Sequence, residues 1–166
     1  GFDKAEPILV ADLNRDGLPE IMLGGRGVAL QFASEGTMQA KLITKQQSPM
    51  SNAAIIADLD SDGESDLAFV APAGQPGGQA SLVVLSGHDR GQFEKPPIVG
   101  WQGVCENPIV LTAGDIDRDG DLDLFVAQYK PPYLGGQMPT PYYDANDGFP
   151  AYLLVNDGKG KFTDGT

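Results

Sequence analysis

Asp58-Leu-Asp-Ser-Asp-Gly-Glu-Ser-Asp66 is one of three nine-residue stretches of this chain that share a pattern. The other two run from Asp12 to Glu20 and from Asp115 to Asp123. Each places acidic or amide side chains at positions 1, 3, 5 and 9 and a glycine at position 6. Hard divalent cations bind several oxygens that converge from a short length of chain, and this spacing supplies them. The pattern therefore predicts a calcium-binding loop that recurs as part of a structural repeat.

The predicted ligands of each ion are the side chains at positions 1, 3, 5 and 9 and the backbone carbonyl at position 7. In sequence order they are Asp12, Asn14, Asp16, Leu18 and Glu20; Asp58, Asp60, Asp62, Glu64 and Asp66; and Asp115, Asp117, Asp119, Asp121 and Asp123. The glycines at position 6 are expected to have positive φ angles, which let the loop turn around the ion. They are Gly17, Gly63 and Gly120. About three Ca²⁺ ions are expected, one in each loop.

The loops differ in charge. The first has three carboxylates and one amide where the other two have four carboxylates, so we expect it to bind calcium most weakly. The alternative is a set of Asp- and Gly-rich turns without metal, but carboxylates this close together repel one another in the absence of a counter-ion. Repetition favours a structural role for the ions over a catalytic one, because an active site rarely recurs in every repeat.

Short apolar segments flank every loop. They precede the loops at 7–11, 53–57 and 108–113 and follow them at 21–23, 67–70 and 122–127. Their content of Ile, Val, Leu and Phe predicts buried strands. An EF-hand has helices on both sides of its loop and a Glu at position 12. That position holds Leu23, Phe69 and Val126 here, so the EF-hand is excluded.

Further strands are predicted between the loops, at 28–32, 38–44, 80–86, 92–99, 151–155 and 161–163. Each unit then consists of a strand, a calcium loop and three more strands joined by turns, which is one blade of a β-propeller. The prediction is an all-β fold in which residues 1–166 form a single propeller segment of about three four-stranded antiparallel blades. The repeats run over about 7–52, 53–107 and 108–166, with an inserted loop at 128–150.

The threefold Asp-x-Asx-x-Asp-Gly-x-x-Asp/Glu pattern, flanked by strands, resembles the FG-GAP/VCBS repeats of integrin-α-like β-propellers. The stretch from Leu154 to Asp164 resembles the VCBS and ASPIC/UnbV type, whereas Leu23-Gly-Gly25 and Val70-Ala-Pro-Ala-Gly74 only echo the Phe-Gly and Gly-Ala-Pro signature. The resemblance implies a ring of about seven blades, and propellers close with four to eight. We therefore expect the remaining blades to come from the rest of a longer protein or from another chain.

Composition excludes several classes of partner and site. The formal net charge is −12 and the 11 Lys and Arg residues form no basic run, so a nucleic-acid partner is not expected. Cys105 is the only cysteine, which rules out an internal disulfide and a cysteine-rich zinc site. No apolar run of about 18 residues is present to span a membrane. Loops of this kind fill where calcium is near millimolar, so we expect an extracellular, cell-surface or periplasmic location.

The inserted loop and the segment that leads to the third blade, which contains Trp101, carry aromatic residues suited to recognition. The candidates for partner binding are Trp101, Tyr129, Tyr133, Tyr142, Tyr143 and Phe149. A long loop with clustered Tyr and Pro offers a large contact area at low entropic cost. Blade topology places this loop on the face opposite the calcium loops, where we expect a protein or glycan ligand. The alternative is that the aromatic side chains pack on one another and cover the propeller.

The function predicted from these features is a non-enzymatic, calcium-stabilised module for adhesion, ligand binding or complex assembly. The alternative is the propeller part of a secreted polysaccharide-active enzyme, whose sugar cleft would involve Asp144 and Asp147. Glycosidases need a pair of carboxyl groups placed across the scissile bond, and no such pair is evident in the sequence.

Overall fold

The computed structural model describes residues 7–25, 28–33, 39–45, 50–93, 95–131 and 148–166. These residues form twelve β-strands and no helix, and none of them lies in a helix able to span a membrane. The strands are β1 (Ile8–Ala11), β2 (Glu20–Gly25), β3 (Val28–Ala33), β4 (Gln39–Lys45), β5 (Ala54–Ala57), β6 (Asp66–Ala71), β7 (Gln79–Leu85), β8 (Ile98–Val104), β9 (Pro108–Gly114), β10 (Asp123–Gln128), β11 (Tyr152–Asn156) and β12 (Phe162–Asp164).

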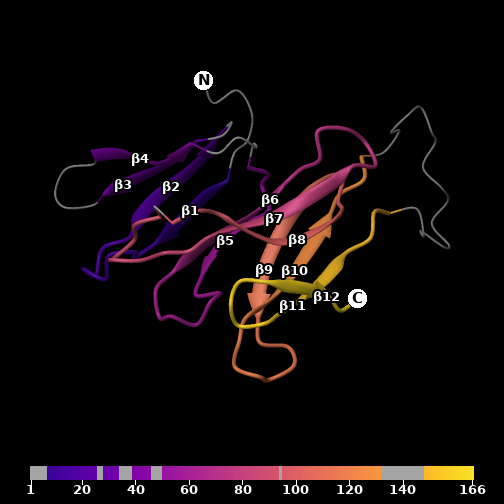
Figure 1. Ribbon diagram of the computed structural model, residues 1–166. Helices are drawn as coiled ribbons and strands as arrows, with labels where there is room; N and C mark the ends of the chain where they lie inside the picture. The colour runs from indigo at the N-terminus through magenta and orange to yellow at the C-terminus, as the bar shows by residue number, and fades with distance from the viewer. Residues whose placement is uncertain (1–6, 26–27, 34–38, 46–49, 94, 132–147) are drawn as a thin grey trace.

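The strands pair into three four-stranded antiparallel sheets, each made of strands that follow one another in sequence (Figure 1). Their orders are β1-β2-β3-β4, β5-β6-β7-β8 and β9-β10-β11-β12. Such a four-stranded meander is one propeller blade, and we call the sheets the first, second and third blades. The predicted all-β segment of three four-stranded blades is confirmed.

The second blade is covered on both faces, and the burial of β6, one of its two inner strands, reflects this. All six residues of β6 are buried. Successive side chains of a strand point to opposite faces. Leu67 and Phe69 pack with residues of the first blade, whereas Ala68 and Val70 pack with residues of the third. A strand between two blades therefore reads as a continuous apolar run rather than as an alternating one.

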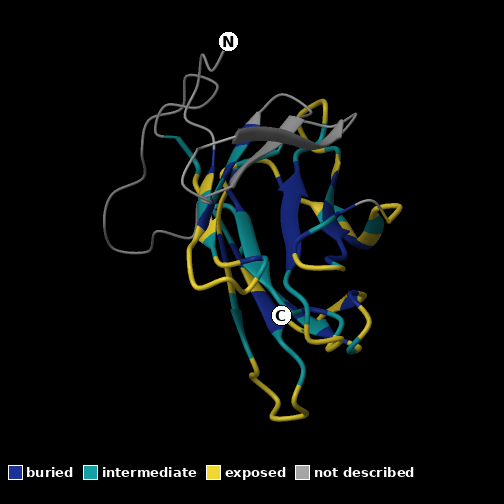
Figure 2. Ribbon diagram, turned by 90° about the vertical axis from the view of Figure 1, so that its left-hand side faces the viewer, coloured by how far each residue is buried: buried dark blue, intermediate teal, exposed yellow. Residues whose placement is uncertain are grey.

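The hydrophobic core lies between the blades. One cluster joins Leu13 and Met22 of the first blade to Phe69 and Phe93 of the second. The other joins the second blade to the third, with Leu59 and Leu124 among its fully buried members. Figure 2 shows buried strands at the centre of the molecule and exposed turns at its margins. Apolar contacts between the faces of neighbouring blades thus hold the segment together.

Polar and aromatic contacts add to the second interface. The Tyr152 hydroxyl donates to the Val104 carbonyl at 2.6 Å, and Asn156 Nδ2 donates to the Leu59 carbonyl at 2.9 Å. The rings of Trp101 and Tyr152 stack in a tilted arrangement with centroids 5.0 Å apart. These contacts connect residues about fifty to a hundred positions apart in sequence, so they fix the two blades relative to each other.

The fourth strand of the second blade lies elsewhere than predicted. The sequence predicts a strand at 92–99, but β8 runs from Ile98 to Val104. Gln92 belongs instead to a turn closed by paired backbone hydrogen bonds with His88, and Phe93 is buried beside Leu13. Trp101 is therefore part of a strand and not of the connection to the third blade.

The acidic stretches and the β6–β7 connection lie at opposite ends of the blades. Figure 1 shows the β1–β2, β5–β6 and β9–β10 turns along the lower edge and the β6–β7 connection along the upper edge. This arrangement follows from antiparallel pairing, since alternate turns of a meander must fall on opposite edges. All three acidic turns accordingly share one side of the molecule.

Candidate metal centre

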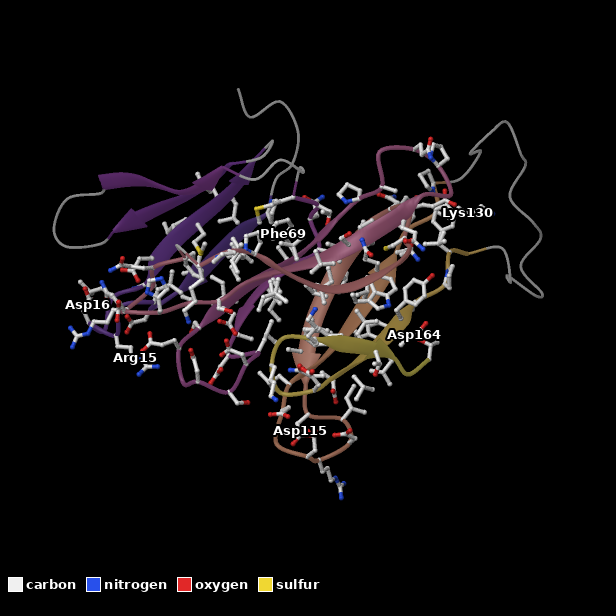
Figure 3. All side chains as sticks on the ribbon, viewed as in Figure 1. Arg15, Asp16, Phe69, Asp115, Lys130 and Asp164 are labelled. Atoms are coloured by element: carbon white, nitrogen blue, oxygen red, sulfur yellow. The ribbon has the colours of Figure 1, made fainter. Side chains whose placement is uncertain are left out.

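Each acidic stretch is the turn that joins the first strand of a blade to the second. The register confirms this, because Ala11 pairs with Glu20, Ala57 with Asp66 and Gly114 with Asp123 across the three turns. Figure 3 shows Arg15 and Asp16 on the first turn and Asp115 on the third. The side chains at positions 1, 3 and 5 thus belong to a short loop between two paired strands.

The three turns follow the same backbone path. The glycines at position 6 have φ angles of 88°, 86° and 100°, which confirms the prediction for Gly17, Gly63 and Gly120. Position 4 also has positive φ: 59° at Arg15, 57° at Ser61 and 67° at Arg118. Side-chain-bearing residues rarely adopt this conformation, and the sequence pattern gave no sign of it. Its recurrence shows that one loop geometry is imposed on three different sequences.

Hydrogen bonds to the backbone hold the acidic side chains around the inside of the turn. In the second loop Gly63 N donates to Asp58 Oδ2 at 3.0 Å, and Glu64 N donates to Asp62 Oδ1 at 2.8 Å. The same two bonds occur in the first loop, at 2.9 Å to Asp12 and at 2.8 Å to Asp16. These bonds orient the carboxylates without the help of a bound ion.

Position 9 has a role that the sequence did not reveal. Glu20, Asp66 and Asp123 are buried, and a carboxylate oxygen of each accepts the amide of the residue at position 2, at 2.8, 2.7 and 2.9 Å. The second oxygen of Asp66 accepts Gly87 N at 2.8 Å, and that of Asp123 accepts Asn156 N at 2.9 Å. In the second and third blades these carboxylates therefore connect the turn to the third strand or to the residues just after it, whether or not they also bind a metal. Burial is the main cause that raises the pKa of Asp66 to about 6.

The carboxylates converge in the second and third loops. One oxygen from each of Asp58, Asp60 and Asp62 lies within 4.8 Å of the others, and the same holds for Asp115, Asp117 and Asp123. Desolvation is the largest cause that raises the pKa of Asp117, and the negative charges of Asp119 and Asp123 add to it. Close groups of oxygen ligands with unfavourable mutual charge are what a hard divalent cation binds.

One oxygen supplies a sharper test of whether a cation fits. Asp58 Oδ1 is buried and has no hydrogen-bond partner among the described residues. A buried acceptor without a partner costs about 1–3 kcal/mol, and more if it is charged. A cation between Asp58, Asp60 and Asp62 would satisfy this oxygen and offset the repulsion between the three groups. The residues of the second loop therefore fit a divalent metal.

The first loop differs because position 3 is an amide. Asn14 Nδ2 donates to Asp16 Oδ2 at 3.0 Å and to Glu20 Oε1 at 3.3 Å, so its hydrogens lie between carboxylates that a cation would otherwise bridge. The side chain would have to give up these bonds to present its oxygen to a metal. This arrangement agrees with the expectation that the first loop is the weakest site.

Position 7 was predicted to contribute only its backbone carbonyl, but its side chains join neighbouring loops. Arg15 Nη2 lies 3.8 Å from Glu64 Oε1, which connects the first loop to the second. Ser61 Oγ donates to Asp121 Oδ1 at 2.8 Å, which connects the second loop to the third. In both cases position 4 of one loop contacts position 7 of the next.

The predicted partner-binding residues have different locations. Tyr133, Tyr142 and Tyr143 lie outside the described residues, as do Asp144 and Asp147. Tyr129 is exposed just after β10, and Phe149 is partly buried. Trp101 is buried against Tyr152 at the interface of the second and third blades, so the sequence reasoning misplaced it on an open face.

Comparison with known proteins gives one finding. Residues 58–126 match the family model of the FG-GAP-like repeat, so this part of the chain is similar to such repeats. The match begins at the first residue of the second acidic loop and ends within β10, just beyond the third loop. A search of curated proteins finds no match to the chain.

Proposed function

We propose that this chain is a calcium-stabilised β-propeller module that serves ligand binding or complex assembly and has no catalytic activity of its own. The observation that carries the proposal is the unpaired, buried Oδ1 of Asp58 within a group of three carboxylates. The recurrence of the same loop path in all three blades supports it. The FG-GAP-like repeat supports it too, because such repeats often bind calcium.

In the second loop the ion would be held by Asp58, Asp60 and Asp62 at positions 1, 3 and 5. In the third loop the converging carboxylates are Asp115, Asp117 and Asp123, so position 9 would also bind the ion there. Bound Ca²⁺ would supply positive charge to each acidic turn and so stabilise the folded chain. The strand-joining position of every loop means that the ion would hold the first two strands of a blade together. Loops of this kind fill where calcium is near millimolar, so the proposal includes an extracellular, cell-surface or periplasmic location.

The ligand surface in this proposal is the face opposite the acidic turns. The β6–β7 connection, rich in Gly and Pro, and the exposed Tyr129 lie at that end of the second and third blades. Exposed aromatic rings and turn backbone are suited to contact with a protein or a glycan. The remaining blades of the ring are a second proposed partner, supplied by the rest of a longer protein or by another chain.

A thermal melt with a metal assay tests the calcium part of this proposal. We expect Ca²⁺ to raise Tm relative to EDTA, because a ligand that binds only the folded state stabilises it by about 2.7 kcal/mol at one hundred times Kd. For a chain of this size that amounts to roughly 5–10 °C for one site. The double variant Asp60→Asn/Asp62→Asn should lose most of the gain from the second loop. Asp89→Asn, an exposed charge outside the loops, is the matched control and should retain it. Equal Tm values in Ca²⁺ and EDTA would contradict the proposal.

A further inference from the structure

Equivalent positions of the three blades differ in exposure in a regular way. Loop position 2 is 2 % exposed at Leu13, 0 % at Leu59 and 55 % at Ile116. The same order holds two residues after the loop, where Met22 and Ala68 are buried and Phe125 is 39 % exposed. It holds again five residues before the loop, where Pro7 and Ala53 are buried and Val110 is exposed. Each set is buried in the first two blades and open in the third.

The neighbouring blade is what buries these positions. Leu13 and Met22 pack with Leu85 and Phe93 of the second blade. Leu59, Ala53 and Ala68 pack in the cluster that contains residues of the third blade, among them Leu124 and Phe162. These positions therefore form the side of each blade that contacts the next one. The third blade has the same apolar side, made by Val110, Ile116 and Phe125, and we call it the outer face.

A polar contact accompanies each of the two interfaces. Position 4 of one loop contacts the side chain at position 7 of the next: Arg15 to Glu64 at 3.8 Å, and Ser61 to Asp121 at 2.8 Å. In the third loop position 4 is Arg118, exposed and held at a φ of 67° like its two equivalents. Among the described residues, the ion pairs formed by arginine and lysine involve Arg15 and Lys95 but not Arg118. Arg118 thus occupies the loop position that contacts an acidic side chain of the next loop at both interfaces within the chain.

We propose, on the basis of the function proposed above, that the outer face docks a further four-stranded blade with an acidic side chain at the seventh position of its own loop. The apolar side chains of that blade would cover Val110, Ile116 and Phe125, and its carboxylate would pair with Arg118. The two interfaces within this chain supply the template for both contacts. The corresponding position of the first blade is Leu18, which is 48 % exposed and uncharged. A second copy of this chain could thus match the apolar contact but not the charge, so the occupant is a different blade.

The first blade of a second copy can be converted into a probe for this rule. The side of the first blade that faces away from the second blade exposes Ile8 and Val10. The substitution Leu18→Glu, at the seventh position of the first loop, would add the missing carboxylate. Sedimentation equilibrium in calcium buffer would then measure head-to-tail self-association of the full chain. Exposed charge pairs contribute about 0.2–1 kcal/mol. We therefore expect Leu18→Glu to associate about two- to thirtyfold more tightly than Leu18→Lys, where the charges repel instead of attracting.

The charge-swapped background makes the test specific. When Arg118→Glu is added, the order of the two Leu18 variants should reverse, so that Leu18→Lys associates more tightly. Arg90→Glu, which changes another exposed arginine with positive φ, should leave the original order unchanged. Ile116→Asp should weaken association in every background, since it places a charge in the apolar contact.

Three results would overturn the inference: no association of Leu18→Glu, the same order in both Arg118 backgrounds, or wild-type association as tight as that of Leu18→Glu. The Tm gain in Ca²⁺, measured on the same samples, reports separately on the proposed function. Variants that still gain stability from Ca²⁺ but show no charge-dependent association would refute the docking rule alone.

Discussion

Asp66→Asn and Asp62→Asn separate the structural role of position 9 from the role of the carboxylates that surround a metal. The Asp66 carboxylate is buried and accepts two backbone amides, Leu59 N at 2.7 Å and Gly87 N at 2.8 Å. An asparagine can accept only one of them, because its NH₂ group would face the other N–H. The substitution therefore weakens one charge-assisted hydrogen bond and leaves a buried donor without a partner.

The magnitude follows from these two losses. A buried unsatisfied donor costs about 1–3 kcal/mol, and charge-assisted bonds are about twice as strong as neutral ones. Removal of the buried charge, whose desolvation raises the pKa of Asp66, offsets the weaker hydrogen bond, so the unpaired donor sets the net effect. We expect Asp66→Asn to lower the free energy of unfolding by about 1–3 kcal/mol in EDTA, which for this size is a fall in Tm of roughly 2–12 °C. Asp62→Asn keeps its acceptor for Glu64 N in an exposed position and should change stability by no more than about 0.5 kcal/mol in EDTA.

The assay is urea unfolding at neutral pH, followed by the fluorescence of Trp101, the single tryptophan, which is buried between the second and third blades. In Ca²⁺ both variants should lose stability relative to wild type, since both remove a carboxylate from the second loop. The separation between them is expected only in EDTA. If Asp66→Asn is no less stable than Asp62→Asn in EDTA, the assignment of Asp66 as the buried link between turn and third strand is wrong.

Three further perturbations test other parts of the account. Burial raises the pKa of Asp66 to about 6, so between pH 4 and 6 the folded chain holds a proton on Asp66 that the unfolded chain has lost. The contribution of Asp66 to stability in EDTA should therefore fall as pH rises through that window, by at most about 3 kcal/mol. Urea unfolding of wild type and Asp66→Asn across this pH range checks the prediction, and identical pH profiles would contradict it. The Cys105 thiol is fully buried and burial raises its pKa to about 11, so a thiol reagent at pH 8 should modify it only after unfolding, with rapid labelling of the native chain as the contrary result. Gly91→Ala should lower stability by about 1–3 kcal/mol, because φ is 87° at this residue and a Cβ would lie 2.7 Å from Leu13 Cβ. Gly74→Ala, where an added Cβ has no neighbour within 4 Å among the described residues, is the control and should be nearly neutral. Equal effects of the two substitutions in calorimetry would show that the close approach of Gly91 to Leu13 is not needed.

The repeat and the strand order were accessible from the sequence because two signals coincide. The acidic turns mark where one strand ends and the next begins, and the apolar segments on either side are short and rich in β-branched residues. The apolar run at 67–70 indicated a buried strand, and the two inter-blade clusters explain why both of its faces are covered. Local spacing was enough for these features since each depends on residues close together in the chain.

Features that depend on the neighbouring blade were not accessible. The segment around Gly100 and Gly103 looked like a connection, but a Cβ at Gly100 would lie 2.9 Å from the Gly160 carbonyl, so close packing of the third blade excludes larger side chains there. Phe93 looked like part of a strand because it is apolar, although its burial comes from contact with the cluster around Leu13. The contacts of Glu64 and Asp121 with preceding loops likewise appear only once the blades are side by side.

The number of Ca²⁺ ions bound per chain, measured by equilibrium dialysis, decides whether the acidic turns are metal sites. We expect about three Ca²⁺ per chain at saturation, with the ion of the Asn14-containing loop lost first as free calcium falls. Asp58→Asn/Asp60→Asn should reduce the count by one, and Asp89→Asn should leave it unchanged. A folded chain that binds no calcium at millimolar concentration, or that keeps its full count after the double substitution, would contradict the assignment of the acidic turns as metal sites.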